Sequence, residues 1–324
     1  MAVRLLWKAC LLLGVVVVLE ALVFFFPGNP DERRRSYLAG WRLKHEQLVG
    51  RGYDRIILAG GSNVAFGVDS SQVHKVTQRE TINLGLLGGI GLGAMLNEVE
   101  EGARAGDLVL LIPEYEHFYG NIMYGDRDAA NLVRYDMSSL RYFSSWGQWK
   151  SLVENAHALA RDTTLGLMDK ARAKMRGGQE ARAVPTIYRS DAFNEYGDVV
   201  AHLNQAPRPD RVAATSTRME GEFNQQALDA IARCARRLAA RGAGFLVFYP
   251  PVAARYWAVN SDLVRQVAAR MPEQWTLTTP EEWVFDDRLF YDTAYHLNRV
   301  GRELRTKKLV HRLPAATRVA TAHR

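Results

Sequence analysis

A serine follows an apolar run and two glycines in IILAGGSNVAFGV, which spans residues 56–68. The apolar run predicts a buried strand, and glycines allow the tight backbone path that leaves a neighbouring hydroxyl uncovered. Ser62, at the end of such a strand, could act as a nucleophile. That chemistry needs a base within hydrogen-bond reach, a group that orients the base, and N–H donors for the developing oxyanion. The alternative is an ordinary turn serine.

The candidate base lies far along the chain in FYDTAYHLNRVG, residues 290–301. His296 could take the serine proton, and Asp292, four residues earlier, could hold the imidazole. His296 also stands at the expected start of a helix, so the alternative role is that of a capping histidine.

The elements that would bring these residues together have the pattern of an alternating α/β domain. Five strands are expected, at residues 55–59, 81–84, 107–113, 244–251 and 275–278. Apolar residues at three- and four-residue steps predict helices near 92–103 and 228–242. Chemistry collects at the carboxyl ends of parallel strands, so Ser62 and His296 are expected to meet in one crevice there.

The chain divides into segments by composition. The boundaries we expect are a membrane anchor at 1–30, a juxtamembrane helix at 31–53, two halves of the α/β domain at 54–117 and 221–312, and a frayed tail at 313–324. Between them, residues 118–220 lose the α/β rhythm and carry many aromatic residues and a helix near 148–176. This stretch is interpreted as an insertion that forms a helical cap over the site.

The N-terminal segment predicts a single-pass membrane protein. Residues 9–26 are almost uniformly apolar, and extension back to residue 5 gives the length of about 20 that a spanning helix needs. No small-residue cleavage site follows, so a retained anchor is expected. Basic residues alone would place the C-terminal side in the cytoplasm. Glu20 stands within the apolar run, where a carboxylate is costly and usually faces a partner or the interface.

Composition argues against several other functions. The chain has 42 basic and 35 acidic residues and a net charge of +7, but the basic residues are scattered, so no nucleic-acid partner is expected. An anionic membrane or glycan accounts for the excess equally well. The motif EYEH at 114–117 lacks metal-ligand spacing, and GLLGGIGLG at 85–93 lacks the context of a dinucleotide loop. We therefore expect no metal and no cofactor.

These residues resemble the SGNH hydrolases, also called GDSL-type esterases. The resemblance rests on Gly60, Gly61 and Ser62 as the first block, NLGLLGG at 83–89 as the second, and Asp292 with His296 as the last. It implies a three-layer, doubly wound parallel sheet of the flavodoxin-like kind. It also implies an oxyanion hole made by the N–H groups of Ser62 and of Gly85 or Gly88. Asn63, Glu114 and Asn298 are further candidates for the lining of the site.

The sequence departs from that family at two places. Glu114 stands where the family has an asparagine donor, and an ionised carboxylate cannot donate to an oxyanion. The spacing from Asp292 to His296 is four residues where the family has three, and in a helix one extra residue turns a side chain by about 100°. If Asp292 misses the imidazole for this reason, Asp286, Asp287 or Glu114 are the alternative partners.

With its anchor and these two departures, the chain resembles the membrane-tethered branch of the family. Members of that branch assist polysaccharide O-acetylation or teichoic acid D-alanylation. The resemblance implies a serine esterase or O-acyltransferase that acts on acyl groups of cell-surface polysaccharide. It further implies a bacterial-type inner or plasma membrane, bound through residues 5–26, with the catalytic domain outside the cytoplasm and a multi-pass acyltransferase as partner. The alternative is a catalytically inactive, glycan-binding or scaffold subunit of such a system.

Overall fold

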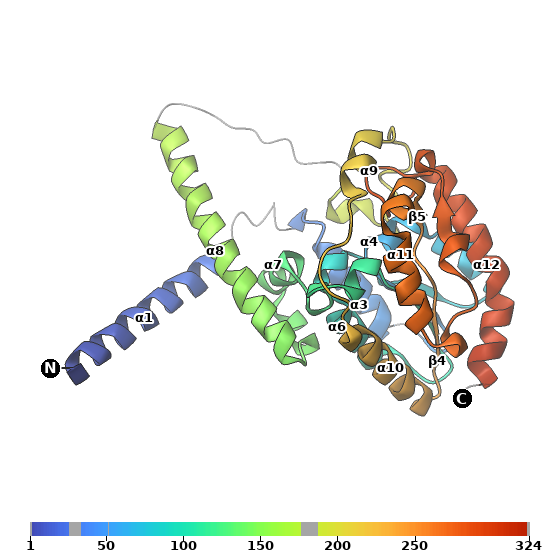
Figure 1. Cartoon of the computed structure of the whole chain (residues 1–324), viewed down its shortest axis with the longest axis horizontal. Coiled ribbons are helices and arrows are strands. Elements are labelled where there is room, and N and C mark those ends of the chain that lie inside the picture. Colours follow the sequence, from blue (N-terminus) through green and yellow to red (C-terminus); the bar gives the residue numbers. More distant parts are fainter. Residues whose placement is uncertain (1, 26–33, 51, 176–186, 323–324) are drawn as a thin grey trace.

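The computed structural model describes residues 2–25, 34–50, 52–175 and 187–322 (Figure 1). Within them, parallel strands form a four-stranded sheet in the order β2-β1-β3-β4. The strands are β1 (Ile56–Gly60), β2 (Thr81–Asn83), β3 (Leu108–Ile112) and β4 (Gly244–Val247). Every residue in them is buried, which means that both faces of the sheet are covered, as expected of a parallel sheet in an α/β protein. The expected α/β class is confirmed.

Helices pack on the sheet along their apolar faces. On α10 (Gln225–Ala240), Leu228, Ile231 and Leu238 are buried at helical spacing, and the Asn224 side chain caps its first turn. This helix packs on β4 and on α6 (Leu92–Gly102), whereas α12 (Arg299–Ala322) contacts β4 together with α4 and α5. Figure 1 shows α10 and α12 flanking β4.

The other elements complete this body. They are α3 (Ala39–Gly50), α4 (Ser62–Gly67), α5 (Ser70–Thr77), α7 (Arg127–Tyr135), α9 (Pro209–Thr215) and α11 (Ala254–Arg270), with short 3-10 turns between them. Two further strands, β5 (Val252–Ala253) and β6 (Val284–Phe285), pair in a separate small sheet.

Two long helices project from the main body in Figure 1, although one end of α8 packs against α7. The first, α1 (Ala2–Phe24), includes Leu6–Phe24, which among the described residues is the one helical stretch long and apolar enough to cross a membrane. The second, α8 (Trp146–Met175), belongs to the predicted insertion and matches the helix expected near 148–176. The described residues between 118 and 220 contribute helices and no strand to either sheet.

Three details differ from expectation. Residues 275–278 form no strand, because the Thr276 hydroxyl bonds locally to the carbonyl of Thr278, whose own hydroxyl accepts from Trp283. The last helix begins at Arg299, so His296 precedes it and does not open it. That helix also continues through Pro314 to Ala322 where a frayed tail was expected, since a proline removes one helical hydrogen bond without necessarily ending the helix.

Candidate functional site

Ser62 lies at the carboxyl end of β1 and is the first residue of α4. Its hydroxyl donates a hydrogen bond to Oε1 of Glu114 over 3.2 Å. The two residues meet because Gly60 at the end of β1 pairs in register with Ile112 at the end of β3, and each side chain follows its strand by two residues. The sheet register therefore places a carboxylate directly beside the candidate nucleophile.

The Glu114 carboxylate is seated in a glycine-lined recess. The backbone N–H of Asn63 donates to Oε1 over 3.1 Å. A Cβ atom added to Gly61 would lie 2.5 Å from Oε1, and one added to Gly88 would lie 1.9 Å from Oε2. Both distances are too short for a side chain, so glycine at 61 and 88 makes room for this carboxylate. The glycine beside Ser62 thus has a packing reason as well as a conformational one.

Asp292 and His296 form the second part of the site. Nδ1 of His296 lies 2.8 Å from Oδ1 of Asp292, and both side chains are almost completely buried. The segment is not helical. The backbone N–H of Tyr291 bonds the carbonyl of His296, and that of His296 bonds the Thr293 hydroxyl, so a turn brings the two side chains together. The four-residue spacing therefore does not separate them.

This pairing determines the proton positions on the imidazole. An ionised carboxylate only accepts, so Nδ1 of His296 carries a proton, and Nε2 is the ring nitrogen that is left to act as a base. Burial raises the pKa of Asp292, but the hydrogen bond and charge of His296 and the hydroxyl of Tyr188 lower it by more, and the net pKa is below its usual value. Asp292 is thus ionised at neutral pH and orients the ring.

Two side chains that the sequence analysis did not identify complete this arrangement. The hydroxyl of Tyr188, in the insertion, donates to Oδ2 of Asp292 over 2.6 Å. The ring of Phe66 stacks on the His296 imidazole, with centroids 3.9 Å apart and planes 4° apart. Phe66 could have been found from its spacing, because it lies four residues after Ser62 on the same short helix. Tyr188 has no such signal.

The two parts of the site meet at α4. Ser62 and Phe66 are four residues apart and therefore lie on one face of that helix, and Phe66 covers the imidazole. Among the described residues, however, no hydrogen bond joins Ser62 to His296, and Nε2 of His296 has no hydrogen-bond partner. The structure brings the Asp292–His296 pair to the helix that carries Ser62, while the serine hydroxyl is bonded to Glu114.

The candidate oxyanion donors differ in availability. The backbone N–H groups of Ser62 and Gly88 donate to no residue in the described part of the chain. The N–H of Gly85 already donates to the side-chain oxygen of Asn83 over 2.9 Å. A Cβ on Gly85 would lie 2.6 Å from atoms of Val64 and Ala65, so this glycine allows the loop after β2 to pack closely on α4. Ser62 and Gly88 are the better placed pair.

Asn63 and Asn298 have structural contacts. The Asn63 amide donates to the carbonyl of Ile112 over 3.1 Å, and its side-chain oxygen accepts from the buried guanidinium of Arg305. Burial lowers the pKa of Arg305 to about 9. Asn298 caps α12, since its side chain accepts from the N–H of Gly301 and donates to the carbonyl of Arg288. Asn63 therefore ties α4 to α12 below the site, and Asn298 supports the helix start.

A buried polar network connects the insertion to the loops around the site. The Asp198 carboxylate accepts from the Ser70 hydroxyl, from the Asn83 amide over 2.8 Å and from Arg302 over 2.8 Å. Nearby, the ring of His202 also contacts the Phe66 ring, with centroids 4.8 Å apart, and its Nε2 bonds the carbonyl of Leu297. Burial lowers the pKa of His202 to about 3, so its ring is neutral at neutral pH.

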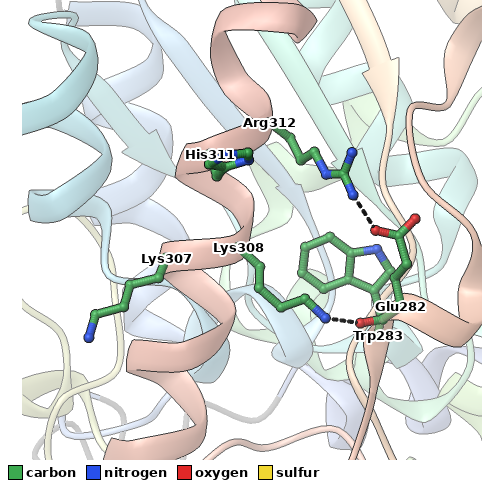
Figure 2. Close-up of a pocket in the computed structure, with 6 residues that line it drawn as sticks. All are labelled: Glu282, Trp283, Lys307, Lys308, His311 and Arg312. Atoms are coloured by element: carbon green, nitrogen blue, oxygen red, sulfur yellow. Dashed lines mark hydrogen bonds and ion pairs between the residues drawn. The ribbon is translucent and has the colours of Figure 1, made fainter.

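Neither a metal site nor a second reactive site is evident in the described residues. No group of three or more His, Cys, Asp or Glu side chains there is arranged to hold a metal ion. A pocket of about 340 Å³ lies along α12, and Figure 2 shows the six residues that line it: Glu282, Trp283, Lys307, Lys308, His311 and Arg312. Arg312 and Lys308 are bonded to Glu282 within the wall, and the pocket contains neither Ser62 nor His296.

The comparisons with family models and with curated proteins identify no relative of this chain. No family model matches it, and no curated protein matches it significantly.

Proposed function

We propose that this chain is a membrane-anchored SGNH-like serine esterase or O-acyltransferase that acts on acyl groups of cell-surface polysaccharide. The observation that carries the proposal is the Asp292–His296 pair, oriented and buried, held by Phe66 against the helix that begins with Ser62. The strand order and the position of Ser62 after β1 support a flavodoxin-like, doubly wound fold. The resemblance to the tethered branch of the family supports the polysaccharide substrate and the multi-pass acyltransferase as partner.

In this mechanism Ser62 Oγ attacks the acyl carbonyl while Nε2 of His296 takes its proton. The backbone N–H groups of Ser62 and Gly88 donate hydrogen bonds to the oxyanion. His296 then returns the proton to the leaving oxygen, and water or a sugar hydroxyl resolves the acyl-enzyme. The first step requires the serine hydroxyl to leave Glu114 and turn toward the imidazole.

The apolar helix α1 supports the proposed location of the protein at a membrane. Leu6–Phe24 has the length and composition of a spanning helix, and the anchor in this proposal places the body of the protein on the outer side of a bacterial-type inner or plasma membrane.

A second candidate function is favoured by Glu114. A carboxylate that accepts from Ser62 and Asn63 fills space at the place where an acyl oxygen would need donors. This arrangement fits an inactive SGNH-like protein that binds glycan or serves as a scaffold for a membrane acyltransferase.

Covalent labelling separates the two functions. The detergent-solubilised full chain is treated with a fluorophosphonate, and the modified residue is located by mass spectrometry. The enzyme proposal expects labelling at Ser62 that is lost in Ser62→Ala and slowed on the order of 10³-fold in His296→Ala. Absence of labelling at Ser62 in the folded wild-type chain, with polysaccharide modification intact in cells carrying Ser62→Ala, would establish the scaffold function instead.

A further inference from the structure

One face of α8 is mostly apolar along its length, with His157 and Thr164 as its polar members. Residues at three- and four-residue steps lie on one side of a helix. Beginning at the first residue of α8, these steps select Trp146, Trp149, Val153, His157, Ala160, Thr164, Met168, Ala171 and Met175. We refer to these nine residues as the α8 stripe.

The anchor helix crosses the α8 stripe near its middle. Nδ1 of His157 lies 2.9 Å from Oε1 of Glu20, in the last part of α1. Phe24 at the end of α1 is buried in a cluster that includes Leu159 and Ala160 of α8. Figure 1 shows α8 running across the C-terminal end of α1, with the sheet domain on the side away from α1. The stripe therefore faces the same side as the anchor.

On both sides of this crossing the stripe is uncovered. Trp146 is 82% exposed, Val153 67% and Met175 79%, and Trp149 and Met168 are also exposed. Large apolar side chains in such number are not expected to face water on a soluble surface. Because they continue along the same face from the contact with α1, they would lie at the level where a spanning helix leaves the bilayer.

The charges of α8 are arranged accordingly. Lys150, Arg161 and Arg172 lie along one edge of the stripe, where long basic side chains can reach lipid headgroups. Glu154 lies on the same edge and pairs with Lys150. Asp162 and Asp169 lie on the far side of the helix. Tryptophan at one end of an apolar face is typical of the membrane interface.

We propose that α8 lies in the plane of the membrane interface and is a second lipid contact of this protein, with the stripe inserted among anionic headgroups. The inference rests on the proposed role of α1 as a membrane span, because α1 gives the direction in which the bilayer lies. The proposal goes beyond that anchor, because a second lipid contact at α8 holds the sheet domain at a defined distance and orientation above the lipid. The site around Ser62 is held with it.

Environment-sensitive fluorophores on the full chain test this contact. Cys10 is first replaced by serine, and Cys234 is left in place because it is buried. In this background the single variants Val153→Cys, Met168→Cys and Asp169→Cys are labelled with NBD. Each is reconstituted into vesicles of phosphatidylcholine and phosphatidylglycerol. Asp169 is the matched control, since it neighbours Met168 but faces away from the stripe. Leu12→Cys reports the depth of α1.

The proposal expects NBD at 153 and 168 to be quenched by spin-labelled lipid and to be about fivefold less accessible to aqueous iodide than NBD at 169. Equal iodide quenching at the three positions would overturn it. Protection from iodide without lipid quenching would also overturn it, because a protein partner or a second copy would then cover the stripe. If the label at residue 12 is not quenched by spin-labelled lipid, the proposal that α1 spans the membrane fails as well. Fluorophosphonate labelling of Ser62 is measured separately, so a failed catalytic proposal is distinguished from a failed lipid contact.

Discussion

The hydroxyl of Ser62 donates a hydrogen bond to Oε1 of Glu114 over 3.2 Å, although the imidazole of His296, whose Nε2 has no partner in the described part of the chain, is held against the same helix. Hydrolysis by Ser62 would require this bond to be exchanged for one to His296. The Glu114 side chain is therefore the feature on which the choice between an enzyme and a scaffold depends most directly.

Replacement of Glu114 by glutamine should accelerate the reaction of Ser62 with a fluorophosphonate. The amide keeps the shape of the side chain but adds N–H donors, which a carboxylate lacks. Loss of one oxyanion donor typically costs about 10²-fold or more, and we expect a gain of about tenfold from the new donor. The measurement is the second-order labelling rate at neutral pH.

The control for this experiment is Glu114→Gln combined with Ser62→Ala, which should not be labelled. A slower rate in Glu114→Gln than in the wild type would mean that the carboxylate assists Ser62 and does not obstruct it.

Replacement of Asp292 by asparagine should lower the labelling rate on the order of 10³-fold. An amide nitrogen facing Nδ1 favours the tautomer in which Nε2 carries the proton, and that nitrogen could no longer accept one from Ser62. Asp286→Asn is the control, since this exposed carboxylate pairs with Arg288. Similar rates in the two variants would remove Asp292 from the mechanism.

Tyr188→Phe should weaken the site more mildly. It removes the hydroxyl that donates to Oδ2 of Asp292, a hydrogen bond to a charged group of the kind worth about 1.5–3 kcal/mol. The hydroxyl lowers the pKa of Asp292, so that pKa should rise in the variant. We expect a labelling rate about tenfold lower and an acidic limb of the rate profile that moves to higher pH. Tyr53→Phe, at an exposed tyrosine, should change neither quantity.

His202 should make the fold less stable in acid. In the folded state its pKa is lowered to about 3 from an ordinary value of 6.5. Below pH 6.5 the unfolded state therefore binds a proton that the folded state does not bind. The contribution to stability is complete above pH 6.5 and is lost as the pH falls toward 3. Between pH 6.5 and 5 this amounts to about 2 kcal/mol. The unfolding midpoint in detergent should therefore fall less steeply over this range in His202→Gln than in the wild type.

Gly88→Ala should lower the free energy of unfolding, measured by denaturant titration in detergent, because the new methyl group would clash with Glu114. The added methyl would lie 1.9 Å from Oε2, so the carboxylate must move or the loop must shift, at a cost of about 1–3 kcal/mol. Gly52→Ala is the control, since its nearest atom would be 3.9 Å away. Combining Gly88→Ala with Glu114→Ala should recover most of the loss in a double-mutant cycle. Strictly additive losses would show that the glycine serves another purpose.

Local patterns in the sequence predicted much of the fold. Continuous apolar runs mark strands that are buried on both faces, and this is why β1, β3 and β4 were expected within a few residues of their positions. The segment 275–278 shows the limit of this reasoning. Its alternation resembles that of a strand, but local hydrogen bonds of threonine side chains determine its conformation.

The candidate site was partly predictable for a similar reason. Ser62, Asp292 and His296 were found because their residue types and their places at strand and helix ends are chemically informative. His202 and Tyr188 were not, because a single ring in an insertion has no distinctive spacing. Phe66 was missed although it lies four residues after Ser62 on the same short helix. Their roles depend on contacts with residues more than ninety positions away.

The amino-acid sequence by itself determined the α/β class, the long apolar N-terminal helix and the serine, histidine and aspartate that could react, since each depends on composition and near-neighbour spacing. Only the tertiary structure decided that Asp292 reaches His296, that Glu114 holds the Ser62 hydroxyl, and that α8 crosses the end of α1. These relationships follow from strand register, from a non-helical turn and from the packing of distant segments. None of the three is specified by any one stretch of the chain.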